Sequence, residues 1–78
     1  MLENLGYKLK TLRVRNQLSR KQVAELVGVS VSTIGLYESN ERLPSLPVLV
    51  KLACQYKTSV DYLLNIDTSD KNSLSLMD

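Results

Sequence analysis

The sequence has no histidine, and its one cysteine, Cys54, has no second thiol with which to form an internal disulfide. Zinc and haem sites and most general-base constellations need histidine or several cysteines, so these shortages exclude most metal and hydrolytic chemistry. We therefore expect no cofactor and no enzymatic activity. No apolar run approaches the roughly 20 residues of a membrane span, and no basic stretch followed by an apolar segment marks the N-terminus for export. These features predict a cytoplasmic protein without a membrane partner.

The chain is also short, and its charge is unevenly distributed. Its 78 residues are enough for one domain with a small core and too few for a multi-domain enzyme. Residues 1–57 carry nine Lys or Arg against four Glu, a net charge of +5, whereas residues 58–78 carry one Lys against four Asp, a net charge of −3. The basic part fits a surface that faces a large anion such as nucleic acid, but a solvated charged helix face explains it equally well.

The first half of the chain carries a helical pattern of apolar residues. The spacing predicts an amphipathic helix over residues 4–16, marked by Leu5, Leu9 and Leu12. The Ser-Arg-Lys-Gln sequence at residues 19–22 matches a capping box, in which the serine accepts from a free amide and the glutamine side chain reaches back. A second helix is therefore expected over about residues 20–27, with a buried face formed by Val23, Ala24 and Val27.

Three further helices are each expected to begin after a side chain that can cap backbone amides. Ser30 caps a third helix over about residues 31–39. Ser45 caps a fourth helix, whose expected inward residues are Leu46, Leu49, Leu52, Ala53 and Tyr56. Thr58 or Ser59 caps a short fifth helix, whose apolar residues close the core: Val60, Leu63 and Leu64. The pattern contains no strand-like alternation, so the predicted fold class is all-α with five helices.

The second and third expected helices, joined by a turn of about three residues, form a helix-turn-helix pattern. Such a pattern needs a small residue where the helices cross, a glycine in the turn, and apolar residues that hold the later helix from behind. The chain supplies these as Ala24, a left-handed Gly28, Val29, Ile34 and Tyr37. With that side buried, the opposite face of the helix over 31–39 protrudes, and its first turn can enter a DNA major groove.

The series L-S-x-x-x-x-A-x-x-x-G-V-S-x-x-T-I-x-x-Y-E-x-x-x-R-x-P-S over residues 18–45 resembles the phage-repressor and Cro-type helix-turn-helix family, whose small members are also called Xre-like regulators. The resemblance covers about residues 5–65. It implies a compact lambda-repressor-like domain, prokaryotic or phage-encoded and nucleoid-associated, that binds double-stranded DNA. It further implies a transcriptional regulator, in our interpretation a repressor, that pairs as a homodimer on an inverted-repeat operator. An ion pair between Arg13 and Glu38 is implied as well, with a DNA contact by Arg13 as the alternative.

The resemblance also carries DNA contacts onto individual positions of this chain. Base contacts are implied for residues of the third helix: Val31, Ser32 and Leu36. Contacts to the DNA backbone are implied for residues around that helix: Arg20, Lys21, Ser30, Thr33, Asn40 and Arg42. Other interpretations stay open, since Lys21 can face solvent, Asn40 can be only a left-handed helix stop, and Leu36 can be an exposed apolar or dimer residue.

The C-terminal part of the chain supports predictions of pairing and of domain limits. We expect a dimer interface around the fifth helix, at Val60, Leu63, Leu64 and Ile66. From Asp67 onward the composition is mostly polar, which divides the chain into a DNA-binding domain over residues 1–66 and a flexible tail over residues 67–78. Cys54 is expected to be a small buried residue.

An alternative function uses the same fold as a protein-interaction module. Its partner would be a toxin, an anti-repressor or a sensor domain, and DNA binding would be secondary. The sequence leaves open the operator, the sign of regulation, the partner, and whether the chain is full length or the N-terminal domain of a longer repressor.

Overall fold

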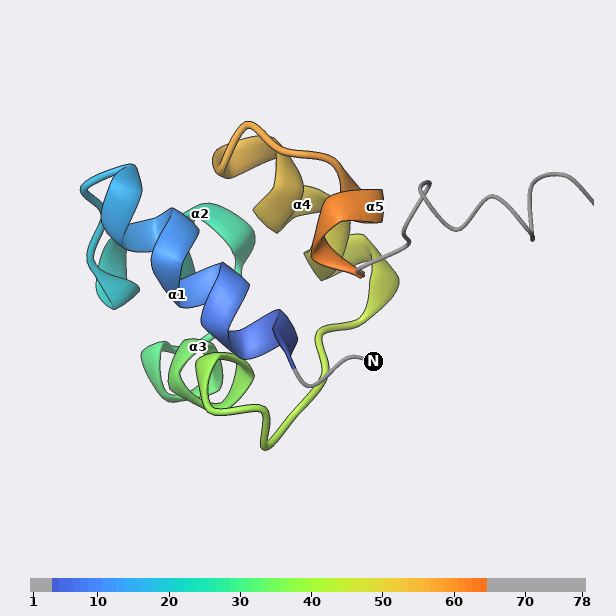
Figure 1. Ribbon diagram of the computed structural model, residues 1–78. Coiled ribbons are helices and arrows are strands. Elements are labelled where there is room, and N and C mark those ends of the chain that lie inside the picture. The colour runs from blue at the N-terminus through green and yellow to red at the C-terminus, as the bar shows by residue number, and fades with distance from the viewer. Residues whose placement is uncertain (1–3, 65–78) are drawn as a thin grey trace, which may run out of the picture.

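The computed structural model describes residues 4–64, which form five helices and, within that range, no strand (Figure 1). The helices are α1 (Leu5–Arg15), α2 (Arg20–Val27), α3 (Val31–Glu38), α4 (Leu46–Gln55) and α5 (Val60–Leu63). The all-α prediction is therefore confirmed, and each expected helix is present near its predicted boundaries. Ile66 and the residues of the expected tail lie outside the described range.

Serine side chains begin four of the five helices, as the sequence predicts. Ser19 and Gln22 form both halves of the capping box: Ser19 Oγ accepts from the Gln22 amide at 3.0 Å, and Gln22 Oε1 accepts from the Ser19 amide at 2.8 Å. Ser30 caps α3, Ser45 caps α4, and Ser59, rather than Thr58, caps α5. Each serine satisfies an amide that has no partner within its helix.

The core lies where all five helices meet. α1 packs against α3 and α5, α2 packs against α3 and α4, and α4 packs against α5. Every helix contributes side chains to this single cluster, among them Leu9, Val23, Ile34, Leu52 and Leu63. The predicted inward residues of the first three helices lie in or against this cluster.

Two predictions for α4 are wrong. Leu46 is 65% exposed because it lies in the first turn of α4, beyond the part of the helix that the core covers. Cys54 is also exposed, because it follows the buried Ala53 by one residue and so points about 100° around the helix from it. The buried stripe of α4 is formed by Leu49, Leu52 and Ala53, and the core continues at Tyr56.

The start of α1 is joined to the end of α3 through Gly6 and Asn40. The Gly6 amide donates to Asn40 Oδ1 at 2.9 Å, and Asn40 holds a left-handed backbone with φ of 65°. A Cβ added at Gly6 would collide with the carbonyl oxygen of Glu38 and would lie 2.9 Å from Asn40 Oδ1. Asn4 makes no side-chain cap of α1, so Asn40 satisfies one of the free amides of that helix instead.

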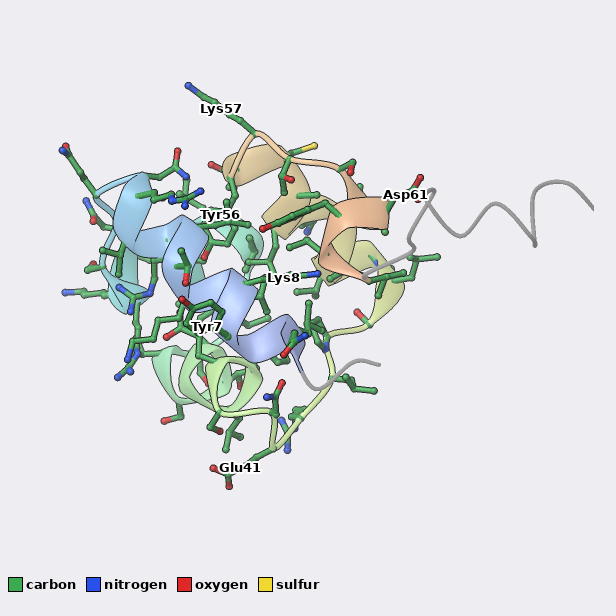
Figure 2. All side chains as sticks on the ribbon, viewed as in Figure 1. Tyr7, Lys8, Glu41, Tyr56, Lys57 and Asp61 are labelled. Atoms are coloured by element: carbon green, nitrogen blue, oxygen red, sulfur yellow. The ribbon has the colours of Figure 1, made fainter. Side chains whose placement is uncertain are left out.

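A second long-range contact joins α1 to α5. Lys8 reaches from α1 toward α5 (Figure 2), where its Nζ donates to the Tyr62 carbonyl at 2.9 Å. The same ammonium lies 4.7 Å from the centroid of the Tyr62 ring, a cation–π distance. Lys8 therefore helps to position the short α5 as well as adding positive charge.

Candidate nucleic-acid interface

The turn between α2 and α3 has the geometry that the sequence predicts. Gly28 is left-handed with φ of 79°, and the amides of Gly28 and Val29 donate to the Ala24 carbonyl at 2.9 and 3.0 Å. Val29 packs against the core, and Ala24 is buried. These contacts fix the direction in which α3 leaves α2.

α3 has one buried and one open side. Ile34 and Tyr37 are buried in the core, whereas Val31 and Ser32 at the start of the helix are exposed. Leu36, the third residue predicted to contact bases, is only partly exposed. The residues most available for base edges are therefore in the first turn of α3.

The hydroxyl groups of Ser30 and Thr33 are bonded to each other at the start of α3. Ser30 Oγ accepts from the Thr33 amide at 3.1 Å and lies 2.8 Å from Thr33 Oγ1. Ser30 is exposed and Thr33 partly exposed. In either direction of the bond between the two hydroxyl groups, one O–H remains to donate to a further ligand, but both groups first serve the helix.

The predicted backbone-contacting residues of α2 and of the loop after α3 are all exposed, and two of them have structural partners. Lys21 and Arg42 extend from the surface. Asn40 uses its side-chain oxygen to bind the Gly6 amide, so its structural role accompanies any DNA contact. Arg20, the first residue of α2, donates a hydrogen bond from Nε to Glu38 Oε1 at 3.2 Å.

Glu38 also pairs with Arg13, as the family resemblance implies. Arg13 Nε donates to Glu38 Oε2 at 2.7 Å, Nη2 donates to Oε1 at 3.3 Å, and Nη1 donates to the Leu18 carbonyl at 2.9 Å. The hydrogen bond to Glu38 raises the pKa of Arg13, against the opposing effect of burial. Burial raises the pKa of the nearby Tyr56 to about 12, and the negative charge of Glu38 adds to that shift. This cluster ties α1 to the last residue of α3.

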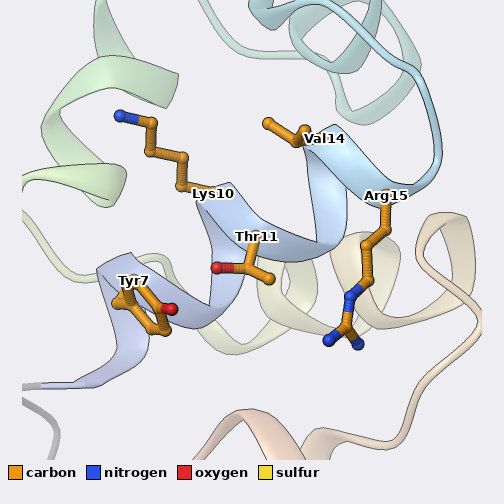
Figure 3. A pocket seen from close by; sticks show the side chains of 5 residues that line it. All are labelled: Tyr7, Lys10, Thr11, Val14 and Arg15. Carbon is orange, nitrogen blue, oxygen red and sulfur yellow. The ribbon is translucent and has the colours of Figure 1, made fainter.

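A shallow groove of about 330 Å³ runs along the outer side of α1 (Figure 3). Residues of this one helix line it: Tyr7, Lys10, Thr11, Val14 and Arg15. The lining is mainly apolar. Two of its residues are exposed, Tyr7 at 72% and also Val14. The groove lacks the convergent polar groups of a small-molecule site.

The residues predicted to form a dimer interface differ in their availability. Leu63 is buried in the core and has no free surface for a partner. Val60 and Leu64 pack against the core but remain partly exposed. Tyr62, which lies between the predicted interface residues, is exposed on the same short helix.

Sequence reasoning missed the contacts that join distant parts of this site. Gly6 and Asn40 are 34 residues apart, and Arg20 and Glu38 are 18 residues apart, so no local spacing predicts either contact. The Lys8 contact with Tyr62 is equally non-local. Only the Arg13 pair had a signal, and that signal was the family resemblance.

Two capped helices joined by a left-handed glycine, with the later helix held from behind and open in front, define a helix-turn-helix DNA-binding domain. The helix-turn-helix family model matches residues 9–63, and the chain belongs to that family of phage-repressor and Cro-type domains. None of the helices within residues 4–64 is long and apolar enough to cross a membrane.

Three curated relatives illustrate the similarity. The chain is 41% identical over 59 residues to the uncharacterized HTH-type transcriptional regulator YobD of Bacillus subtilis, covering 76% of this chain and 53% of that protein. It is 35% identical over 75 residues to the HTH-type transcriptional regulator ImmR of Bacillus subtilis, covering 95% and 59%. It is 35% identical over 54 residues to the cryptic phage CTXphi transcriptional repressor RstR of Vibrio cholerae, covering 69% and 48%. The chain spans about half the length of these relatives.

Proposed function

We propose that this chain binds DNA as a transcriptional repressor that acts in the cytoplasm on nucleoid or phage DNA. It inserts α3 into the major groove of an inverted-repeat operator and binds there as a homodimer. The observation that carries the proposal is the orientation of α3: its rear is fixed by Ile34 and Tyr37, and its first turn, with Val31 and Ser32, is open. The names of the relatives ImmR and RstR support regulation, and that of RstR supports repression.

In this proposal the base contacts are weakly polar. Val31 and Leu36 can touch only an apolar surface such as a thymine methyl group, and Ser32 can donate to or accept from several bases. α3 carries no Lys or Arg. Specificity therefore comes from shape and from several modest contacts rather than from a bidentate arginine–guanine pair.

Affinity in the proposal comes from the residues that flank α3. Arg20 and Lys21 bind phosphates at the start of α2, where the free amides of the helix also favour an anion. Arg42 contributes from the loop after α3, and Ser30, Thr33 and Asn40 add polar contacts. Binding to phosphates releases counterions, so affinity should fall steeply with salt.

The homodimer is proposed because one small module offers few base contacts and a small core. Of the residues first expected at the interface, Val60 and Leu64 keep free surface in the structure, and the exposed Tyr62 extends that surface. Two-fold pairing would place two copies of α3 on half-sites about one helical turn apart.

Selection of bound sequences from a pool of random duplexes tests this function. The proposal predicts enrichment of an inverted repeat with half-site centres about 10 base pairs apart. Enrichment of one unrepeated half-site would reject the homodimer but keep DNA reading by α3. No enrichment, with affinity independent of salt, would reject the DNA-binding function.

A second candidate function is binding of a protein partner such as a toxin or an anti-repressor, with DNA secondary. The observation in its favour is the mainly apolar groove on the outer side of α1, with Tyr7 and Val14 exposed. A duplex titration over a salt series separates the two candidates, since only the first predicts a steep negative slope of log affinity against log salt.

A further inference from the structure

Glu38, the last residue of α3, accepts hydrogen bonds from two arginines on two other helices. Its side chain is only 4% exposed. Arg13 of α1 donates from Nε and Nη2, and Arg20 of α2 donates from Nε at 3.2 Å. One negative charge therefore faces two positive charges, and the three side chains together keep a net charge of +1.

The two arginines are held in different ways. The Arg13 side chain is 11% exposed, and all three of its guanidinium nitrogens donate hydrogen bonds: Nε and Nη2 to Glu38, and Nη1 to the Leu18 carbonyl. Arg20 is 49% exposed and is held through Nε alone. Among the residues that the structure describes, its two Nη groups find no hydrogen-bond acceptor. The cluster therefore leaves one edge of one guanidinium available at the surface.

That free edge has the chemistry to bind a phosphate. The donors of a guanidinium form a rigid fork, and the two terminal nitrogens can bind two oxygens of one phosphate group. An arginine whose plane is already fixed loses less side-chain freedom on binding than a mobile one does. Arg20 is also the first residue of α2, where the free amides favour an anion.

We propose that Glu38 is a positioning residue for recognition of the DNA backbone: it orients the Arg20 guanidinium so that the two Nη groups grip one phosphate. Arg13 balances the charge of the buried carboxylate, so Arg20 presents the remaining positive charge to DNA. The inference rests on the proposed DNA-binding function and adds to it a role for a residue that itself does not touch DNA.

The substitution Arg20→Lys tests the inference without removing charge from the surface. A lysine has a single ammonium group. It cannot donate one hydrogen bond to Glu38 and at the same time present two coplanar N–H donors to a phosphate. We expect the affinity of the Arg20→Lys variant for duplex DNA to fall about tenfold, close to the loss caused by Arg20→Ala. Arg15→Lys, the same change at an exposed arginine of α1, is the matched control and should stay within about twofold of the wild type.

A double-mutant cycle then isolates the role of Glu38. Glu38→Gln is measured alone and in the Arg20→Ala background, at a temperature where circular dichroism shows each variant folded. The inference predicts about a tenfold loss of duplex affinity in the first case and less than about twofold in the second, because the residue acts through Arg20.

Two results would overturn the inference: wild-type affinity for Arg20→Lys, or an equal loss for Glu38→Gln in both backgrounds, which would mark a purely structural role. These results differ from failure of the proposed function. A wild-type protein that binds no duplex at low salt would reject DNA binding itself, whereas wild-type binding that Arg20→Lys leaves intact would reject only the positioning role.

Discussion

Two of the glycines occupy helices and have opposite surroundings. Gly6 lies where α1 meets the end of α3, and any Cβ there would collide with the Glu38 carbonyl oxygen. Gly35 lies within α3, and a Cβ there would meet nothing within 4 Å. Of these two positions, only Gly6 must lack a side chain for the helices to pack closely.

Gly6→Ala should destabilise the domain, and Gly35→Ala should stabilise it. The added methyl group at Gly6 forces α1 away from α3 and weakens the bond to Asn40, at a net cost of about 1–3 kcal/mol. Alanine at Gly35 gains up to about 1 kcal/mol of helix propensity without a clash inside the domain. Urea denaturation of both variants measures the two free energies of unfolding. A Gly6→Ala protein with the same free energy of unfolding as the wild type would contradict the described packing of α1.

The raised pKa of Tyr56 predicts how the free energy of unfolding changes at alkaline pH. Its pKa is raised to about 12 in the folded protein, chiefly by burial. Below about pH 10 the phenol is protonated in the folded and the unfolded chain, so it adds no pH dependence there. Between pH 10 and 12 the unfolded chain ionises first, so the free energy of unfolding should fall as pH rises, by about 1–2 kcal/mol.

Tyr56→Phe should reduce this alkaline loss of stability, because it removes only the group that ionises. Thermal or urea denaturation at pH 8, 10 and 11.5 provides the comparison. Tyr7→Phe is the matched control, since Tyr7 is mostly exposed, and it should keep the loss of the wild type. An identical pH profile for Tyr56→Phe and the wild type would show that the loss arises elsewhere.

At the scale of helices, the signals that the sequence carries are local ones. Capping serines and the left-handed Gly28 act within three or four residues, and they placed the starts of α2 to α5 correctly. The exposure of Leu46 and Cys54 depends instead on how far the core covers α4, which the spacing of apolar residues does not contain. The contact of Arg20 with Glu38 depends on how α2 and α3 cross.

Ser30 and Ser32 lie two residues apart at the start of α3, and of the two Ser30 is the cap of that helix. Ser30→Ala removes the cap and should cost about 1 kcal/mol of stability, because the Thr33 amide loses its acceptor. Ser32→Ala changes an exposed side chain that makes no cap and should stay within about 0.5 kcal/mol of the wild type. Chemical denaturation measures both values. A loss of stability in Ser32→Ala equal to that in Ser30→Ala would contradict this division.

At the scale of the whole molecule, the uneven charge of the sequence now has a structural arrangement. Within residues 4–64 the basic residues lie on α1, at the start of α2, in the loop after α3, on α4 (Lys51) and after it (Lys57), while α3 has none. Part of that charge serves the fold, since Arg13 pairs with Glu38 and Lys8 binds α5. Under the proposed function, Arg20 and its neighbours hold the phosphates and the first turn of α3 reads the bases, so affinity and specificity come from different residues.

This division of labour is tested most directly by measuring the sequence preference and the salt dependence of two variants on the same set of duplexes. Ser32→Ala should change the preferred base at one position of each half-site and leave the slope of log affinity against log salt unchanged. Arg20→Ala should lower affinity by a similar factor for every sequence and reduce that slope by about one. Unchanged base preference in Ser32→Ala, together with an unchanged salt slope in Arg20→Ala, would contradict the proposed docking of α3 in the major groove.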